Sequence, residues 1–212
     1  MTIPESAKQF IADAGRRLWQ QGLTTAADGN ISLRLEGDTV LATPSGVSKG
    51  FLRPDDMLLT DMDGKVLEGR GQPSSELKMH LAIYKVRPDV RAIVHAHPPT
   101  ATGFAAAGIA LDTPLIAEAV VMLGKVPVAP YAAPGTQAVA DNVAALAREH
   151  DCILMANHGA VTCGKTPEQA LLRMETLEHF AKVTLTARLL GKTAALKPED
   201  VEYLLKQRQN AG

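Results

Sequence analysis

Two hairpin patterns in the first third of the chain constrain the fold more than any other feature of the sequence. Residues 31–35 alternate apolar and polar side chains, and a second strand-like run follows after a Gly-containing turn at residues 39–43. A similar pair, residues 57–60 and 66–68, flanks an Asp-Gly turn. A period of two is typical of half-buried strands, and short turns of this kind join antiparallel neighbours. The sequence therefore predicts an antiparallel sheet that begins near residue 31.

Beyond residue 70, short apolar strands interleave with helices. Apolar runs at residues 92–97, 126–129 and 152–156 indicate buried strands. The helices predicted from apolar spacing and from helix start and stop signals cover residues 6–21, 74–86, 99–107, 135–150, 167–190 and 198–205. No repeat, low-complexity segment or linker divides the 212 residues. We therefore predict a single α/β domain over residues 1–212, with a mixed, largely antiparallel sheet and helices on both of its faces.

The composition argues against several classes of partner. With 22 basic and 23 acidic residues and no basic block, the chain gives no electrostatic support for binding nucleic acid or an anionic membrane. No apolar run reaches the ~20 residues that span a bilayer, and the N-terminus lacks the pattern of a signal peptide. Two cysteines, Cys152 and Cys163, do not indicate a disulfide framework. The expected location is therefore a reducing cytoplasm.

Two histidines stand at the end of the predicted strand 92–97. His95 and His97 are two residues apart, so both side chains point to the same face of a strand. Imidazole is a favoured ligand of zinc, and a strand end lets side chains leave the packed core. The alternative is one histidine in the core and one exposed by coincidence. The pair alone therefore only suggests a metal site.

A third histidine strengthens the hypothesis. His158 follows the buried strand 152–156 and is flanked by Asn157 and Gly159. Catalytic zinc typically has three protein ligands and one open position, and three histidines on two strand ends supply that set. The alternative for His158 is a turn residue that caps the next segment.

Glu76 is the candidate acid of the site. It lies in the first turn of the predicted helix 74–86, where a carboxylate commonly does no more than favour the helix dipole. As a functional group it could ligate the metal or act as a general base. His80 would share its helix face, where a histidine is more often a core residue.

Three short segments rich in Gly, Ser and Asn could bind phosphate. Their backbone N–H groups, amides and hydroxyls suit an anion, although the same residue types are common in ordinary turns. The candidate residues are Gly29, Asn30, Ser45, Gly46, Ser74 and Ser75. None of these segments forms a Walker loop or a dinucleotide fingerprint, so a nucleotide is not supported.

These motifs together resemble the class II aldolase/adducin family, whose best-known enzyme is L-fuculose-1-phosphate aldolase. They occur in the family's order between residues 8 and 190. The matching stretches are Ala27-Asp28-Gly29-Asn30-Ile31-Ser32, Thr43-Pro44-Ser45-Gly46, Pro73-Ser74-Ser75-Glu76, His95-Ala96-His97-Pro98, Ala129-Pro130-Tyr131-Ala132 with Pro134-Gly135-Thr136, and Asn157-His158-Gly159.

The resemblance implies a three-layer α/β/α fold with a central, mainly antiparallel sheet. It implies zinc, one ion per chain, held at His95, His97 and His158, with Glu76 as both apo-state ligand and catalytic acid/base. It implies a substrate phosphate bound by residues of the three Gly/Ser segments, namely Asn30, Ser45, Gly46, Ser74 and Ser75, with Gly29 shaping its loop. It also implies a homo-oligomer, commonly a tetramer, with active sites between subunits.

Two positions bear on the reaction. Where fuculose-phosphate aldolases carry a catalytic tyrosine, this chain aligns Glu118, which becomes the candidate second acid/base. The related 4-epimerases carry aspartate where this chain has Glu76, and this favours an aldolase. The expected reaction is cleavage of a phosphorylated ketose or close analogue to dihydroxyacetone phosphate and an aldehyde.

Other reactions and one non-catalytic role stay open. A decarboxylase, dehydratase or 4-epimerase acting on a phosphorylated sugar or sugar acid would need the same metal site. An adducin-like oligomerisation module is the alternative from a different class, but such members lack the zinc histidines that this chain carries.

Overall fold

The computed structural model describes residues 3–210 and contains one sheet of eight strands in the order β4-β3-β2-β1-β5-β8-β7-β6. The strands are β1 (Asn30–Arg34), β2 (Thr39–Ala42), β3 (Leu58–Asp61), β4 (Val66–Glu68), β5 (Ala92–Ala96), β6 (Val128–Ala129), β7 (Cys152–Met155) and β8 (Gly159–Gly164). Every neighbouring pair is antiparallel except β6 and β7. The prediction of a mixed, mainly antiparallel sheet is confirmed.

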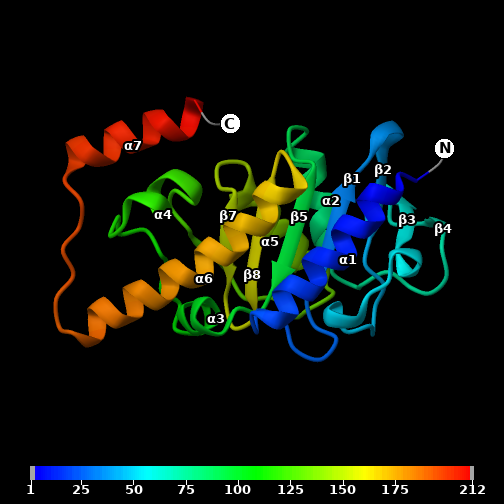
Figure 1. The fold of residues 1–212 in the computed structure, drawn as a ribbon, viewed down its shortest axis with the longest axis horizontal. Helices are drawn as coiled ribbons and strands as arrows, with labels where there is room; N and C mark the ends of the chain where they lie inside the picture. The colour runs from blue at the N-terminus through cyan, green and yellow to red at the C-terminus, as the bar shows by residue number, and fades with distance from the viewer. Residues whose placement is uncertain (1–2, 211–212) are drawn as a thin grey trace.

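Helices cover both faces of this sheet (Figure 1). They are α1 (Glu5–Gln20), α2 (Leu77–Val86), α3 (Pro99–Ala106), α4 (Ala117–Met122), α5 (Gln137–Ala147), α6 (Pro167–Leu189) and α7 (Pro198–Asn210). Three short 3-10 turns add η1 (Glu36–Asp38), η2 (Lys49–Phe51) and η3 (Pro54–Asp56). Side chains of α1, α3 and α6 build one hydrophobic cluster, and those of α2 and α5 build a second. The expected α/β/α layering is confirmed.

Alternation along the central strands explains why two cores form. In β5, Val94 enters the cluster shared with α1 and α6, whereas Ile93 enters the cluster shared with α2 and α5. A strand that is buried on both faces feeds both layers in turn. The same alternation separates the cysteines: Cys152 lies in the first cluster and Cys163 in the second, and both are free and buried.

Two elements were not expected from the sequence. Strand β8 follows His158 directly, and β7 and β8 form a hairpin whose turn contains Asn157 with a φ of +54°. Its six residues, Gly-Ala-Val-Thr-Cys-Gly, are buried on both faces and begin and end with glycine, so they show no alternation. Helix α4 lies in residues 114–128, a stretch rich in apolar side chains for which no helix was predicted.

The predicted start of the second helix was wrong by three residues. Helix α2 begins at Leu77, whose N–H donates to the Ser74 carbonyl, and the Ser74 hydroxyl accepts from the Glu76 N–H. Residues 74–76 therefore form a turn, and Glu76 precedes the helix. The last helix also runs further than expected, to Asn210.

Helix α7 is fixed to the body of the molecule by charge. Asp151, just before β7, accepts from the guanidinium of Arg208 on α7 at 2.7 Å and lies 2.9 and 3.0 Å from those of Arg173 and Arg87. Arg208 also donates to the Val121 carbonyl of α4, so α7 covers α4. Over residues 3–210, no helix combines the length and apolar character needed to cross a membrane.

Candidate metal centre

Three strand ends meet at one edge of the sheet. In the ladders, Asn30 at the start of β1 pairs with His95 near the end of β5, and Ala96 pairs with Ala160 at the start of β8. His97 follows β5, and His158 sits in the turn between β7 and β8. Antiparallel pairing thus brings three distant segments of the chain together at the same edge.

The structure places the three histidines and Glu76 around one point. His95 Nε2 lies 3.2 Å from His97 Nε2 and 3.2 Å from Glu76 Oε2, and His158 Nε2 lies 3.1 Å from Glu76 Oε1. One ligand nitrogen from each of the three histidines lies within 4.8 Å of the other two. Ligands of a tetrahedral ion at about 2.0–2.1 Å are about 3.3 Å apart. The spacing of these donors therefore fits a zinc-sized ion.

Second partners orient the imidazole rings. His95 Nδ1 lies 2.9 Å from the Ala160 carbonyl, and His97 Nδ1 lies 3.2 Å from Asp28 Oδ2. Both partners accept hydrogen bonds, so each Nδ1 is assigned the proton and each Nε2 turns its lone pair inward. Two lone pairs at 3.2 Å repel each other unless a positive charge lies between them.

The electrostatics of the cluster favour that positive charge. Burial opposes ionisation of Glu76, but His95 and His158 outweigh it and hold the pKa of Glu76 well below its usual range. Burial works to lower the pKa of His95, yet Glu76 and the Ala160 carbonyl raise it overall. Burial, reinforced by the charge of His95, lowers the pKa of His97 to about 4. A divalent ion can replace the proton that this arrangement attracts.

Glu76 is positioned by its own turn and by strand β1. Asn30 Nδ2 donates to Glu76 Oε2 at 2.9 Å and to Ser74 Oγ at 3.2 Å. The Glu76 side chain makes no capping bond to α2. Its carboxylate points at two histidines instead, which supports the functional interpretation over the helix-dipole one.

The proposed phosphate loops lie beside this cluster. Pro44 and Pro73 form a β-bridge, and the Ser45 N–H donates to the Gln72 carbonyl at 2.8 Å. The segment with Ser45 and Gly46 is thereby joined to the one with Ser74 and Ser75. Ser45, Gly46 and Ser75 are exposed, and Ser74 is half-buried.

Gly29 is required by two separate constraints. Its φ is +70°, and a Cβ there would lie 2.8 Å from the His95 carbonyl oxygen. Left-handed backbone and close approach both favour glycine. The loop before Asn30 can therefore pack directly against the strand that carries His95.

Glu118 is not brought to the cluster within one chain. It is exposed in the first turn of α4, which packs against α6 and α7. No contact found among residues 3–210 joins Glu118 to Glu76 or to the three histidines. Its role as a second acid/base stays a prediction.

Two residues near the site were not singled out from the sequence. Asp28, which lies within a quoted motif, faces His97 and is held by the Thr25 N–H at 2.6 Å. Lys49 is only 2% exposed and donates to the carbonyls of Ala27 and Val47. Burial lowers the pKa of Lys49, against the charges of Asp28 and Glu76. No spacing pattern could have revealed Lys49, because its partners are main-chain carbonyls, one of them in the separate loop that contains Ala27.

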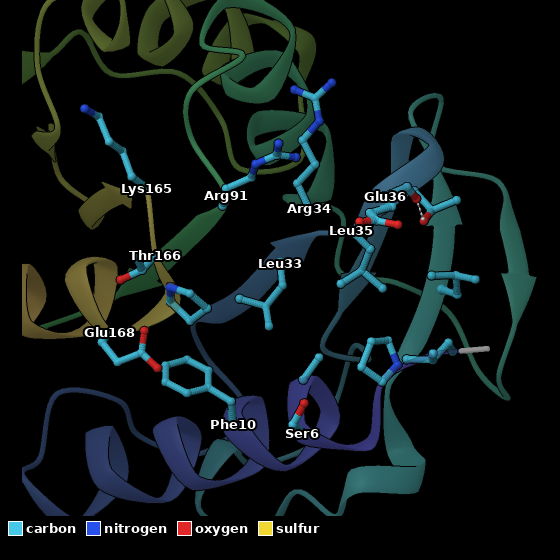
Figure 2. A pocket seen from close by; sticks show the side chains of 16 residues that line it. Ser6, Phe10, Leu33, Arg34, Leu35, Glu36, Arg91, Lys165, Thr166 and Glu168 are labelled. Carbon is cyan, nitrogen blue, oxygen red and sulfur yellow. Dashed lines mark hydrogen bonds between the residues drawn. The ribbon is translucent and has the colours of Figure 1, made fainter. Parts of the chain in front are cut away.

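A cavity of about 670 Å³ lies at the other end of the same strands (Figure 2). Leu33 and Leu35 line it together with Phe10 and the start of α6. His158 borders a much smaller hollow of about 10 Å³. The larger cavity is therefore separate from the histidine cluster, beside which Ser45, Gly46 and Ser75 lie exposed.

Comparison with known proteins identifies the family. The sequence profile of the "Class II Aldolase and Adducin N-terminal domain" matches residues 9–185. The chain belongs to the class II aldolase and adducin family. The family resemblance and the fold expected from it are thus confirmed.

Its relatives within the class II aldolase and adducin family carry more than one activity. A 5-deoxy-D-ribulose 1-phosphate aldolase of Bacillus thuringiensis serovar kurstaki is 31% identical, covering 100% of this chain and 99% of that protein. A 3-oxo-tetronate 4-phosphate decarboxylase of Escherichia coli K12 is 34% identical, covering 85% and 87%. The solved structure of an L-fuculose 1-phosphate aldolase matches with a TM-score of 0.91 at 31% identity, covering 98% of both chains.

A buried histidine behind the site generates a prediction about pH. His80 is 1% exposed, bonds through Nδ1 to the Ser32 hydroxyl at 2.7 Å, and has no partner at Nε2 among residues 3–210. Tyr84 donates to the Ser32 carbonyl and completes this small network. Burial, together with the charge of His95 and against that of Glu76, lowers the pKa of His80 from 6.5 to about 3.

Below pH 6.5 the unfolded chain binds a proton at His80, whereas the folded chain stays unprotonated there until the pH nears 3. The free energy of unfolding is therefore greatest above pH 6.5 and falls as the pH drops towards 3. This group alone should remove about 2 kcal/mol of unfolding free energy between pH 8 and pH 5. Urea titrations of chelator-treated protein at both pH values measure the loss. His80→Gln should flatten the dependence by that amount, whereas His179→Gln, on an exposed position of α6, should not. An unchanged pH slope in His80→Gln would contradict the assignment.

Proposed function

We propose that the chain is a zinc-dependent aldolase that cleaves a phosphorylated ketose, or a close analogue, to dihydroxyacetone phosphate and an aldehyde. The observation that carries the proposal is the Glu76 carboxylate bridging His95 and His158, with His97 beside them. Three imidazoles leave room for substrate on a zinc ion, and two Ser/Gly loops lie next to them. Aldolases of two sugar phosphates among the relatives support the same conclusion.

The protein's own groups have separate tasks in this reaction. Glu76, ionised and oriented by Asn30, takes or returns the proton at the carbon next to the carbonyl. The loops with Ser45 and Ser74 hold the phosphate and keep the reacting bond in register. Zinc, when bound by the histidines, supplies Lewis-acid stabilisation of the negative charge that develops on the substrate oxygens.

A decarboxylase is the second candidate, because a relative named as a 3-oxo-tetronate 4-phosphate decarboxylase is as similar as the aldolases. Loss of carbon dioxide from a 3-oxo acid and retro-aldol cleavage both leave electron density next to a carbonyl. The same donor set can therefore serve either reaction. Dehydration and 4-epimerisation of such substrates are variants of this candidate.

A metal and product assay tests the proposal. Protein purified without chelator should contain about one equivalent of zinc per chain. It should release dihydroxyacetone phosphate from at least one member of a panel of phosphorylated ketoses, while carbon dioxide is followed from phosphorylated 3-oxo sugar acids. Chelation should abolish turnover and added zinc should restore it. Carbon dioxide as the only product would select the decarboxylase, and activity that is independent of metal would contradict both.

Glu76→Gln tests the acid/base role. The variant keeps the size of the side chain and should retain substrate affinity, but turnover should fall ~10²–10⁴-fold because the proton acceptor is lost. Zinc content, measured in parallel, separates loss of the base from loss of the ion. Glu202→Gln, exposed on α7 and paired with Lys206, is the control and should keep full activity. Near-normal turnover of Glu76→Gln would show that another group transfers the proton, and Glu118 would be the next candidate.

We further propose a homotetramer, with sites completed between chains, in the cytoplasm. The exposed Ser45, Gly46 and Ser75 beside the histidines support a shared site, because a second chain could cover them. Much of the apolar stretch 114–128 is buried in its own fold, but Leu189 and Leu190 at the end of α6 are each 79% exposed. Exposed apolar groups of this kind suit a subunit contact. The free, buried Cys152 and Cys163 fit a reducing compartment.

Mixing two variants tests for shared sites. If His95 of one chain works with Glu118 of a neighbour, His95→Ala and Glu118→Gln should each be inactive alone. After subunit exchange in an equal mixture, about a quarter of the sites should be active. In that quarter, chance places a chain with native His95 beside a neighbour with native Glu118. Light scattering should show tetramers throughout. A fully active monomer would refute the shared site, and an active Glu118→Gln would remove Glu118 from it.

A further inference from the structure

Glu178, in the middle of α6, is a buried carboxylate that the proposed chemistry does not use. It is 2% exposed. Its oxygens accept from the Thr100 N–H at 3.0 and 3.1 Å and from the Ala101 N–H at 2.9 Å. Lys182, one turn further on, lies 3.4 Å away. A charge buried this far needs such partners, since burying it unpaired is costly.

These bonds cap helix α3 from 77 and 78 residues away in the sequence. Helix α3 begins at Pro99, directly after His97 and Pro98, and Pro98 offers no side-chain cap. The first N–H groups of a helix have no partner within it, and they attract negative charge. Glu178 satisfies two of them and ties α3 to α6.

The far end of α3 touches the other histidine turn. The Ala105 carbonyl lies 3.4 Å from the donating N–H of Asn157, the residue before His158. A Cβ on Gly159 would lie 2.6 Å from both the Ala96 carbonyl oxygen and His97 Cδ2. The turn that contains His158 therefore packs closely against the segment that contains His97. A shift of α3 would therefore move the supports of His97 and His158 together.

His95 is supported differently. It lies inside β5, paired with Asn30 on one side and Val161 on the other, so the sheet itself holds its backbone. His97 and His158 lie outside the strands, where ladder bonds do not fix them. The His97 N–H donates to the Leu23 carbonyl and the His158 N–H donates to the Met155 carbonyl, and α3 adds a further support to both turns.

We propose that Glu178 is a positioning residue for the metal centre, acting through α3 on His97 and His158. The role rests on the proposed metal centre. Groups that orient metal ligands without touching the ion commonly change metal affinity by about 10–100-fold when they are altered. Glu178 acts one layer further out, on the backbone that carries two of the ligands.

Cobalt binding to the full-length protein provides the test, with its visible absorption spectrum as a readout independent of activity. Glu178→Gln keeps the size of the side chain but turns an amide towards one of the α3 N–H groups. It should weaken Co²⁺ binding about 10-fold or more and alter the spectrum. Glu178→Asp retains the charge on a shorter side chain, so its Co²⁺ affinity should lie between those of the unchanged protein and Glu178→Gln. It replaces the Gln variant as the test if that variant does not fold.

Leu171→Ala is the matched control, because it removes buried apolar contacts from the same helix α6 without touching α3's cap. It should lower the melting temperature at least as much as Glu178→Gln, yet keep Co²⁺ affinity and spectrum. Unchanged affinity and spectrum in both Glu178 variants would overturn the role, as would an equal loss of affinity in Leu171→Ala. Failure of the unchanged protein to bind Co²⁺ or zinc would instead overturn the metal centre itself.

Discussion

The pairing of β5 with β1 on one side and β8 on the other is the constraint on which the rest of the site depends. These ladders place Asn30 opposite His95 and Ala96 opposite Ala160. All three strands are buried, so a register shift by one residue would send their side chains to the wrong faces of the sheet. Register is therefore set by both hydrophobic cores, and the positions of the polar groups at the edge follow from it.

Around that edge, support is graded from rigid to adjustable. His95 is fixed by the sheet, His97 and His158 by turns packed against α3, and the Ser/Gly segments by one β-bridge between exposed loops. Burial and charge follow the same order. The most deeply buried group, His95, lies against the Glu76 carboxylate, whereas the uncharged Ser45 and Ser75 face solvent. The candidate metal ligands are therefore held more firmly by the fold than the segments proposed to bind phosphate.

The sequence was informative where local patterns carry structure. Alternation and turns predicted the hairpins of β1 to β4, and the strand-end position of His95 and His97 predicted their convergence. Strand β8 was not predicted, because a strand that is buried on both faces shows no alternation of apolar and polar residues. The start of α2 was predicted wrongly, because the Ser74 hydroxyl caps a turn that precedes the helix. Glu178 and Lys49 could not be found, because each binds main-chain atoms, which carry no residue-type signal, of a segment distant in the sequence.

The exposed segments beside the histidines have a consequence for how a family like this can diversify. His95 lies within the sheet and His97 and His158 lie in turns next to it, whereas Ser45 and Ser75 lie on exposed loops, so the two sets of residues can change independently over evolutionary time. Substitutions at the exposed positions Ser45 and Ser75 would leave the register of β5 and β8 unchanged. A scaffold of this kind suits a family whose members are named as aldolases of different sugar phosphates and as a decarboxylase.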